Sequence, residues 1–367
     1  MPLVLVDLLS YTGTKGGMET FARELYSHLG TIETDYQFVG LASTEFMTMD
    51  HSWFPGRVIG SGISGENRFS WAYGELFAVA RWAKKLDVDL IHSPATLGPM
   101  FSAMPTILTV HDLLYFSHPK LMSTGLYTRP VRWMEKRASR NAARIMTDSE
   151  ASASDIRKYL KYPSDRLEVV LLAGTPQKTN QRRAPEPGGL ILATGNRRPH
   201  KNWAGLVRAM ALVPIGVRPK LVVTGSRGDD PLRPIVDELS LHDWVELKSW
   251  VSSEELEDLY ARATAVAMPS FCDGFCLPAL DAMMSGIPVI ISDIPVYREV
   301  TGDAALYFDP HNLQTIADAV VAITTDATLV ASVTAKGFDR AKLFSWEKVS
   351  RDVLSNFATA IAAGPRR

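Results

Sequence analysis

The apolar positions of the chain repeat one pattern, in which a short buried-strand run is followed by a longer segment with helical spacing. In the first half such runs are 3–9, 37–41, 90–92, 106–110 and 167–171, and in the second half they are 190–193, 220–224, 245–247, 265–268 and 287–291. Helical spacing separates many of them, as in 18–29, 71–86, 203–212 and 253–262. This alternation is typical of parallel sheets with crossover helices. We therefore predict an α/β fold with two doubly wound, Rossmann-like halves.

The two halves are separated by a change in composition. Residues 174–189 contain three prolines, three basic residues and almost nothing apolar, which predicts a linker between domains 1–173 and 190–345. The last segment, 346–367, is expected to be a helix and tail that pack back on the first domain. A further stretch, 45–69, is predicted to be a long loop rich in Met, Trp and Phe. It either serves acceptor recognition or packs its own aromatic residues as an Ω-type loop.

Composition excludes several classes of protein. The chain is 46% hydrophobic and 22% charged, and 39 basic against 40 acidic residues give a net charge of -1, so no nucleic-acid partner is expected. Cys272 and Cys276 are too few for a disulfide framework and lack the further ligands that zinc requires.

The location of the chain follows from two further features. Without a basic leader or an apolar run of about 18 residues, we expect a cytoplasmic protein. The segment 120–136 mixes Arg129, Arg132 and Lys136 with aromatic residues. It is either a solvated face or a peripheral contact with the inner face of a membrane.

The segment 269–290 carries the strongest chemical signal in the sequence. Pro278 suits the first position of a helix and Gly286 the residue after its last. The unpaired N–H groups and dipole of such a helix start attract phosphate. Asp273 lies in the preceding loop and Asp281 lies in the helix. These features predict a site for a nucleotide diphosphate.

A basic cluster follows the first predicted strand of the second half. Arg197, Arg198 and Lys201 lie where ligands bind in open α/β sheets, at the carboxyl end of a strand. Their forked donors and point charge complement a diphosphate and stabilise negative charge on a departing oxygen. The alternative is an ordinary solvated loop.

Two features of the first half also lie at carboxyl ends of predicted strands. Gly13, Gly16 and Gly17 join a strand to a helix, which resembles a mononucleotide-binding turn but matches neither a dinucleotide fingerprint nor a Walker loop. A tight turn that merely needs glycine is the alternative. His111 either hydrogen-bonds a substrate hydroxyl or is structural.

An ordered set of motifs runs along nearly the whole chain: Gly16-Gly17, 110–113, 149–150, 195–202, 273–289 and 344–346. In this order they resemble those of the retaining glycosyltransferases of family 4. The resemblance implies the GT-B fold, in which two Rossmann-like domains face each other across a cleft. It also implies transfer of a sugar from a nucleotide diphosphate sugar, with UDP- or GDP-sugars expected, to a hydroxyl of a glycan, lipid-linked or small-molecule acceptor. Neither a metal nor a resident cofactor is implied, because basic residues and helix N-termini would do the work that Mg²⁺ does in other enzymes. The leaving phosphate is expected to act as the base, so no side-chain nucleophile is expected.

The same resemblance suggests roles for residues of the second half. Asp273 would lie near the donor sugar, Asp281 would hold the ribose and Lys201 would bind the diphosphate. Backbone amides would face the sugar and phosphates at Gly274, Phe275, Cys276 and Leu277. Asn196 stands where an arginine is common, so Arg197 or Arg198 would take that role.

In the first half, the resemblance places His111 near the transferred sugar. Gly16 and Gly17 would form the loop that approaches the donor phosphate and the acceptor.

Three departures from the family pattern bear on activity. Asp273 and Asp281 replace two glutamates, and each side chain is shorter by one C–C bond, about 1.5 Å. Cys276 stands where glycine is common. The donor site is therefore specialised or weakened, and the alternative function is a non-catalytic nucleotide-sugar-binding protein or partner subunit.

Overall fold

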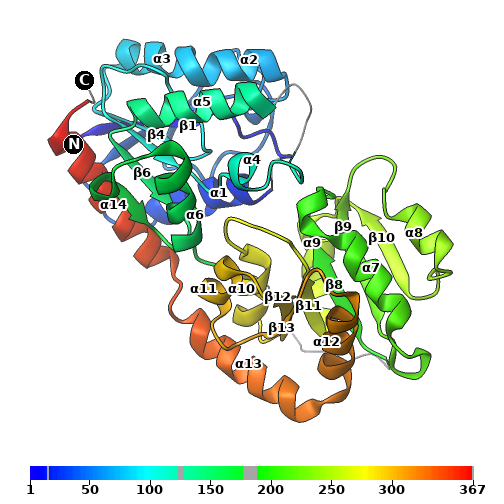
Figure 1. The fold of residues 1–367 in the computed structure, drawn as a ribbon. Helices are drawn as coiled ribbons and strands as arrows, with labels where there is room; N and C mark the ends of the chain where they lie inside the picture. Colours follow the sequence, from blue (N-terminus) through cyan, green and yellow to red (C-terminus); the bar gives the residue numbers. More distant parts are fainter. Residues whose placement is uncertain (15, 123–127, 177–187, 366–367) are drawn as a thin grey trace. The chain divides into compact units, whose positions relative to one another are not determined.

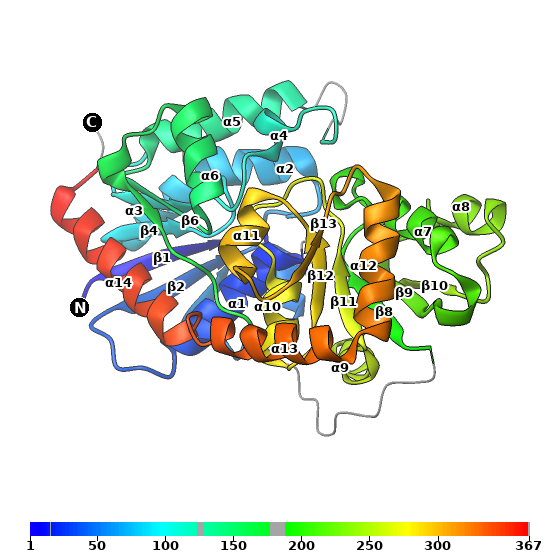
Figure 2. The ribbon, with the colours of Figure 1, turned by 60° about the horizontal axis from the view of Figure 1, so that its bottom comes forward.

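The computed structural model describes residues 1–14, 16–122, 128–176 and 188–365. These residues form two compact units, shown with the rest of the chain in Figures 1 and 2. One unit comprises Met1–Pro119, Ser123–Leu172 and Ser345–Arg367, and the other comprises Lys120–Met122 and Ala173–Phe344. The expected linker 174–189 lies largely outside the described residues, at 177–187.

The first unit is built on a parallel sheet of seven strands in the order β3-β2-β1-β4-β5-β6-β7. Its strands are β1 (Leu3–Leu8), β2 (Gln37–Ala42), β3 (Gly56–Gly60), β4 (Leu90–Ser93), β5 (Thr106–Thr109), β6 (Arg144–Thr147) and β7 (Leu167–Val169). Its helices are α1 (Gly17–Leu29), α2 (Arg68–Tyr73), α3 (Val79–Leu86), α4 (Leu114–Ser117), α5 (Thr128–Asn141), α6 (Glu150–Asp155) and α14 (Trp346–Ala363). A π-helical segment, Gly74–Ala78, joins α2 to α3, so 68–86 is one continuous helix that we call the 68–86 helix.

The second unit repeats this plan with six parallel strands in the order β10-β9-β8-β11-β12-β13. The strands are β8 (Leu190–Thr194), β9 (Lys220–Ser226), β10 (Val245–Ser249), β11 (Ala265–Met268), β12 (Val289–Ser292) and β13 (Leu306–Phe308). The helices are α7 (Trp203–Leu212), α8 (Arg233–Glu238), α9 (Ser253–Arg262), α10 (Leu277–Met284), α11 (Pro295–Thr301), α12 (Leu313–Thr325) and α13 (Ala327–Ala341). The predicted α/β fold with two Rossmann-like halves is therefore confirmed.

Strand order determines where ligands can bind in each sheet. The first strand of each unit lies between the second strand and the strand after the crossover, so order reverses at β1/β4 and at β8/β11. At such a reversal the loops that follow the two strands diverge and leave a crevice at their carboxyl ends. Central strands are buried along their whole length because helices cover both faces of the sheet, as in β4 and β12, where all four residues are buried.

The predicted loop 45–69 is wrong over Gly56–Gly60, which forms the edge strand β3. The alternating pattern was absent because this strand is largely exposed, and its glycines weaken the signal. Gly56 is needed there, since a Cβ would lie 2.1 Å from the carbonyl oxygen of Phe38. Phe46 and Trp53 pack their rings against Tyr11, at 4.9 and 5.6 Å between centroids. Phe46 and Trp53 therefore belong to the domain's own packing, whereas Phe69 at the end of the stretch is exposed.

The C-terminal helix α14 belongs to the first unit, which includes Ser345–Arg367. Ser345 caps it, with its hydroxyl oxygen accepting a hydrogen bond from the Lys348 amide. Trp346 lies 6.5 Å from Phe21 of α1, and Phe357 lies 5.8 Å from Tyr36, between ring centroids. Among the described helices, none is by itself long and apolar enough to cross a bilayer; α12 and the segment Ala327–Ala363 meet that criterion only as a pair bent by 94°.

Candidate active site

Lys201 and Asp273 meet at the carboxyl edge of the second sheet. Lys201 ends a single 3₁₀ turn after β8, and Asp273 lies in the loop between β11 and α10. Because β8 and β11 are neighbours, these two loops flank the crevice at the strand reversal. The Lys201 Nζ lies 2.7 Å from the Asp273 Oδ2, and the two side chains are 16% and 14% exposed. The structure thus brings together two of the residues predicted from sequence.

Tyr297 completes this pair and was missed by the sequence interpretation. Its hydroxyl donates to the same Asp273 Oδ2 at 2.8 Å, while the Gly274 amide donates to Oδ1 at 3.1 Å. Burial raises the pKa of Tyr297 well above its usual value, and the nearby Asp273 raises it further, so the phenol remains a donor. The shortened carboxylate is therefore held by three donors from its own domain. No hydropathy pattern could single out Tyr297, because a buried tyrosine in α11 gives the same pattern as a residue of the hydrophobic core.

Cys276 immediately precedes α10, and its side chain is buried. Its φ of -170° is extended backbone that any residue adopts, so this position does not require the glycine common in the family. Burial, and next the Asp273 carboxylate, raises the pKa of the Cys276 thiol to about 12, so the thiol stays neutral. Phe275 is also buried, with its ring 6.3 Å from that of Phe344. The side chains of Phe275 and Cys276 therefore fill the domain interior and do not line an open pocket.

Asp281 lies in the second turn of α10 and holds the start of the interdomain segment. Its Oδ1 accepts a hydrogen bond from the Thr175 amide at 2.8 Å. Gly174 fits closely against the same helix, since a Cβ there would lie 2.8 Å from Asp281 Oδ1 and 3.0 Å from Leu280 Cγ. The predicted ribose contact of Asp281 is untested, but one carboxylate oxygen already has this structural partner.

Arg197 and Arg198, which the sequence left as alternatives for one role, differ sharply in the structure. The Arg197 guanidinium donates to Asp230 Oδ2 at 2.8 Å and to the carbonyls of Thr224 and Val223, at 2.6 and 2.9 Å. These bonds tie the loop after β8 to β9. Because the side chain is only 7% exposed, its guanidinium has no free edge for a diphosphate. Arg198 is exposed. We therefore correct the expectation for Arg197 and retain Arg198 for the predicted role.

Asn196 also shapes this loop. Its Oδ1 accepts from the Arg198 amide at 3.2 Å, and its carbonyl accepts from the Trp203 indole at 2.8 Å. These bonds hold the loop after β8 in place at the start of α7. Its predicted contact with the donor stays a prediction.

The glycine turn of the first unit is built as predicted, at the carboxyl end of β1. Gly16 precedes α1 with φ 68° and ψ -125°, a conformation that essentially only glycine adopts. Glu19 folds the turn by accepting from the Thr12 and Thr14 amides, at 2.6 and 3.2 Å. A Cβ at Gly17 would meet no atom within 4 Å. Packing within the protein therefore does not require a glycine at position 17, and the space beside the start of α1 is open.

His111 is buried just beyond β5 and both of its ring nitrogens have protein partners. Nδ1 lies 2.6 Å from Asp148 Oδ2, and Nε2 lies 2.9 Å from the Pro94 carbonyl oxygen. Because both partners are acceptors, this geometry fits a protonated ring. Burial works to lower the pKa of His111, but the Asp148 carboxylate outweighs it and the pKa is raised. The structural interpretation of His111 is supported, and its predicted contact with the transferred sugar is untested.

A buried carboxyl pair, Asp7 and Glu75, lies beside the glycine turn and was also missed. Glu75 comes from the π-helical segment and accepts from Ser10 Oγ at 2.7 Å and from the Trp71 indole at 2.8 Å, while Asp7 accepts from Ser93. Burial, then the Asp7 charge, raises the pKa of Glu75 well above its usual value, so the pair holds a proton. π-helical segments concentrate at functional sites. The pair fixes the 68–86 helix to the end of β1.

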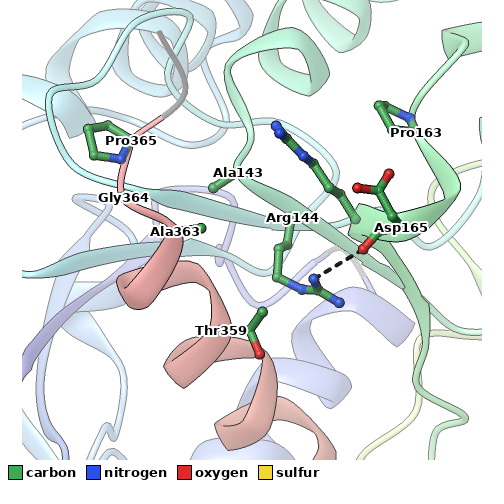
Figure 3. Close-up of a pocket in the computed structure, with 9 residues that line it drawn as sticks. Ala143, Arg144, Pro163, Asp165, Thr359, Ala363, Gly364 and Pro365 are labelled. Carbon is green, nitrogen blue, oxygen red and sulfur yellow. Dashed lines mark hydrogen bonds between the residues drawn. The ribbon is translucent and has the colours of Figure 1, made fainter.

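A separate cavity of about 840 Å³ lies at the amino end of β6, away from the carboxyl edge of the first sheet (Figure 3). Arg144 in its wall is already bonded to Asn356 Oδ1 at 2.8 Å and to the Asp165 carbonyl at 3.4 Å. This cavity is therefore not assigned to the reaction. Within the described parts of the chain, no group of three or more His, Cys, Asp or Glu residues could hold a metal ion.

Comparison with known proteins now decides the family. Residues 15–171 match the model "Glycosyltransferase Family 4", and residues 175–339 match "Glycosyl transferases group 1". The chain is 32% identical over 270 residues to the O-antigen chain mannosyltransferase B of Escherichia coli, covering 68% of this chain and 69% of that protein. The chain belongs to glycosyltransferase family 4. The resemblance inferred from the ordered motifs is thereby confirmed.

A further relative and two solved structures are also similar to this chain. The MMP alpha-(1->4)-mannosyltransferase of Mycolicibacterium hassiacum is 28% identical, over 75% of this chain and 72% of its own. The sucrose-phosphate synthase of Thermosynechococcus elongatus has a similar fold, with a TM-score of 0.78 at 20% identity over 99% of this chain and 100% of its own. Anabaena HepE, solved in complex with UDP and glucose, has a TM-score of 0.74 at 16% identity over 98% and 100%. The fold is GT-B, and the chain is a glycosyltransferase.

Proposed function

We propose that this glycosyltransferase transfers a hexose from a nucleotide diphosphate sugar to a hydroxyl of a glycan, lipid-linked or small-molecule acceptor, with retention of anomeric configuration. Mannose is the first sugar to test, because the O-antigen and MMP relatives are mannosyltransferases. The observation that carries the proposal is the Lys201 ammonium, fixed 2.7 Å from Asp273 at the carboxyl edge of the second sheet.

The chemistry needs positive charge where the diphosphate departs. Negative charge develops on the oxygen that leaves the anomeric carbon, and an ammonium held in place stabilises it without reorganising. The start of α10, which follows Asp273 by four residues, adds the positive end of a helix dipole. In the proposal Lys201, Arg198 and this helix start replace the divalent cation that other enzymes use.

The remaining residues position the donor. Backbone amides of Gly274 to Leu277 face the sugar and phosphates, Asp281 meets the ribose, and Gly16 and Gly17 let the first-domain loop approach closely. The leaving phosphate takes the proton of the attacking hydroxyl on the face that it vacates. No side chain acts as nucleophile in this proposal, and the enzyme works in the cytoplasm or at the inner face of a membrane.

A donor panel tests the proposal. The purified chain is mixed with GDP-mannose, UDP-glucose, UDP-galactose and dTDP-glucose, with and without glycan acceptors, in buffer containing EDTA. Release of nucleoside diphosphate from one donor, and an α-linked product by NMR from an α-linked donor, are the expected results. Thermal stabilisation by a donor without turnover, across all acceptors, would instead favour the non-catalytic alternative.

A further inference from the structure

The outer faces of two neighbouring helices in the first unit carry exposed aromatic residues. In the 68–86 helix, Phe69, Tyr73 and Phe77 are four residues apart and so form one stripe. They are 90%, 48% and 38% exposed, and Trp133 of α5 is 48% exposed. Exposed aromatic residues scattered singly are ordinary, but a stripe of three on one helix is not.

The two helices lie side by side, as both views show (Figures 1 and 2). Leu76 of the first helix packs in one apolar cluster with Val131 and Met134 of α5. The loop between β4 and β5 joins them, because the Met100 amide donates to the Leu76 carbonyl and the Asn141 side chain donates to the Pro99 carbonyl. The two outer faces therefore form a single surface.

All exposed charge on these two helices is positive. Residues 68–86 contain four basic residues and 128–141 contain five, and the acidic residues of both ranges are Glu75 and Glu135 alone. Both of those carboxyls are buried, at 1% and 6% exposure. The exposed basic residues include Arg81, Lys84, Lys85, Arg129, Lys136 and Arg140. We call these residues, with Phe69, Tyr73, Phe77 and Trp133, the aromatic–basic surface.

We infer that the aromatic–basic surface docks on an anionic lipid bilayer. Aromatic rings on a helix surface insert at the headgroup level, and neighbouring Lys and Arg side chains are attracted to anionic headgroups. The surface is uniformly positive although the chain as a whole has a net charge of -1, so the positive charge is local. Cation–π contacts hold the two kinds of residue together, with Arg81 5.6 Å from the Tyr73 ring centroid and Arg137 5.8 Å from that of Trp133.

The bilayer-facing helix is also tied to the segment between β1 and the glycine turn. On the face opposite the aromatic stripe, Trp71 and Glu75 hydrogen-bond Ser10 at the end of β1. Docking of this helix would therefore fix the loop that the proposed function assigns to donor and acceptor. The inference involves no catalytic residue, so binding to a bilayer can be tested separately from sugar transfer.

Vesicle binding by the full chain tests the inference. Co-sedimentation is measured with vesicles of phosphatidylcholine alone and of phosphatidylcholine mixed with phosphatidylglycerol, at low and high salt. We expect binding to the mixed vesicles that weakens with salt, and about fivefold weaker binding for each basic residue removed, tested with Arg129→Gln and Lys136→Gln. The triple variant Phe69→Ser, Tyr73→Ser, Phe77→Ser should also lose binding.

Matched control substitutions lie in the second unit and in α14. Ile215→Ser removes an apolar residue that is 71% exposed, within the range of the three stripe residues, and Arg233→Gln with Arg351→Gln removes two exposed charges. The control variants should bind vesicles as tightly as the wild type does. Control and test variants should all have the melting temperature of the wild type. Equal binding to both vesicle types, unchanged binding by the triple variant, or tighter binding to a single-stranded oligonucleotide at the same salt would overturn the inference.

Discussion

The Lys201 ammonium lies 2.7 Å from the Asp273 carboxylate, and the Tyr297 hydroxyl lies 2.8 Å from the same carboxylate oxygen. The aspartate that replaces the family's first glutamate therefore has a definite structural function, which is to hold the charge of Lys201 at the sheet edge. A longer side chain would displace one of these donors. The short carboxylate is thus paired with Lys201, Tyr297 and the Gly274 amide within its own domain.

Tyr297→Phe tests this arrangement. Losing a hydrogen bond to a charged group costs about 1.5 to 3 kcal/mol when the partner stays buried. Asp273 is still paired with Lys201, so we expect the lower end, about tenfold in kcat with the preferred donor. Tyr307→Phe is the matched control, because its hydroxyl bonds Thr301 and Gly302 instead. Equal kinetics for the two variants would show that Tyr297 does not position Asp273.

Restoring the family's glutamate at Asp281 should be harmful. The extra methylene would push the carboxylate into Gly174 and Thr175, whose backbone already lies against it. We expect Asp281→Glu to lower the unfolding free energy by about 1 to 3 kcal/mol, as overpacking generally does, and Gly174→Ala to do the same. Chemical denaturation followed by fluorescence measures both. A double Asp273→Glu, Asp281→Glu variant with wild-type stability and activity would show that neither position is specialised.

Substitutions of the two arginines in the loop after β8 should have different effects, one on stability and the other on activity. Arg197→Ala leaves Asp230 buried without its partner, which costs about 3 kcal/mol or more. Arg198→Ala changes an exposed residue, so its stability should stay within about 0.5 kcal/mol of the wild type while the KM for the donor rises. Melting curves and donor titrations of both variants give the comparison. A stable Arg197→Ala protein would contradict the structural assignment.

Much of the fold could be predicted from sequence because each βα unit carries its own local signal. Apolar runs located the central strands, and α7, α9 and β11 begin and end where the pattern placed them. β3 was missed because an exposed edge strand with terminal glycines has no buried face to create an alternating pattern. Hydrophobic periodicity reports burial, so it fails where a strand is exposed.

The site was predicted only as far as charge and position along the chain allow. Lys201 and Asp273 were found because polar residues after buried strands collect at one sheet edge. Tyr297 and Asp148 were not, because their importance comes from a partner distant in sequence, 24 and 37 residues away. Arg197 and Arg198 could not be distinguished for the same reason, since burial against Asp230 is a property of the fold.

Glu135 predicts how stability depends on pH. Its carboxyl is buried in α5, and burial, with a further contribution from Asp112, raises its pKa from 4.5 to about 8. The folded state therefore binds the proton more tightly than the unfolded state. The stability that this provides is complete below about pH 4.5 and is lost as the pH rises through 8.

The test is the unfolding free energy of wild type and Glu135→Gln at pH 5 and pH 8.5. The wild type should lose on the order of a few kcal/mol more than the variant over this range, because the amide does not ionise. Glu168→Gln, an exposed carboxylate of the same unit, serves as the control and should retain the wild-type pH dependence. Parallel curves for wild type and Glu135→Gln would contradict the buried, protonated carboxyl.

The most direct test of the donor site is the rate of sugar transfer by Lys201→Ala, measured with the preferred donor at saturating acceptor and checked for native fold by circular dichroism. The account predicts a loss of about 100-fold or more in kcat, as when a fixed donor to a developing negative charge is removed, with partial recovery in Lys201→Arg. A folded Lys201→Ala enzyme that transfers sugar at the wild-type rate would contradict the assignment of Lys201 to the departing diphosphate.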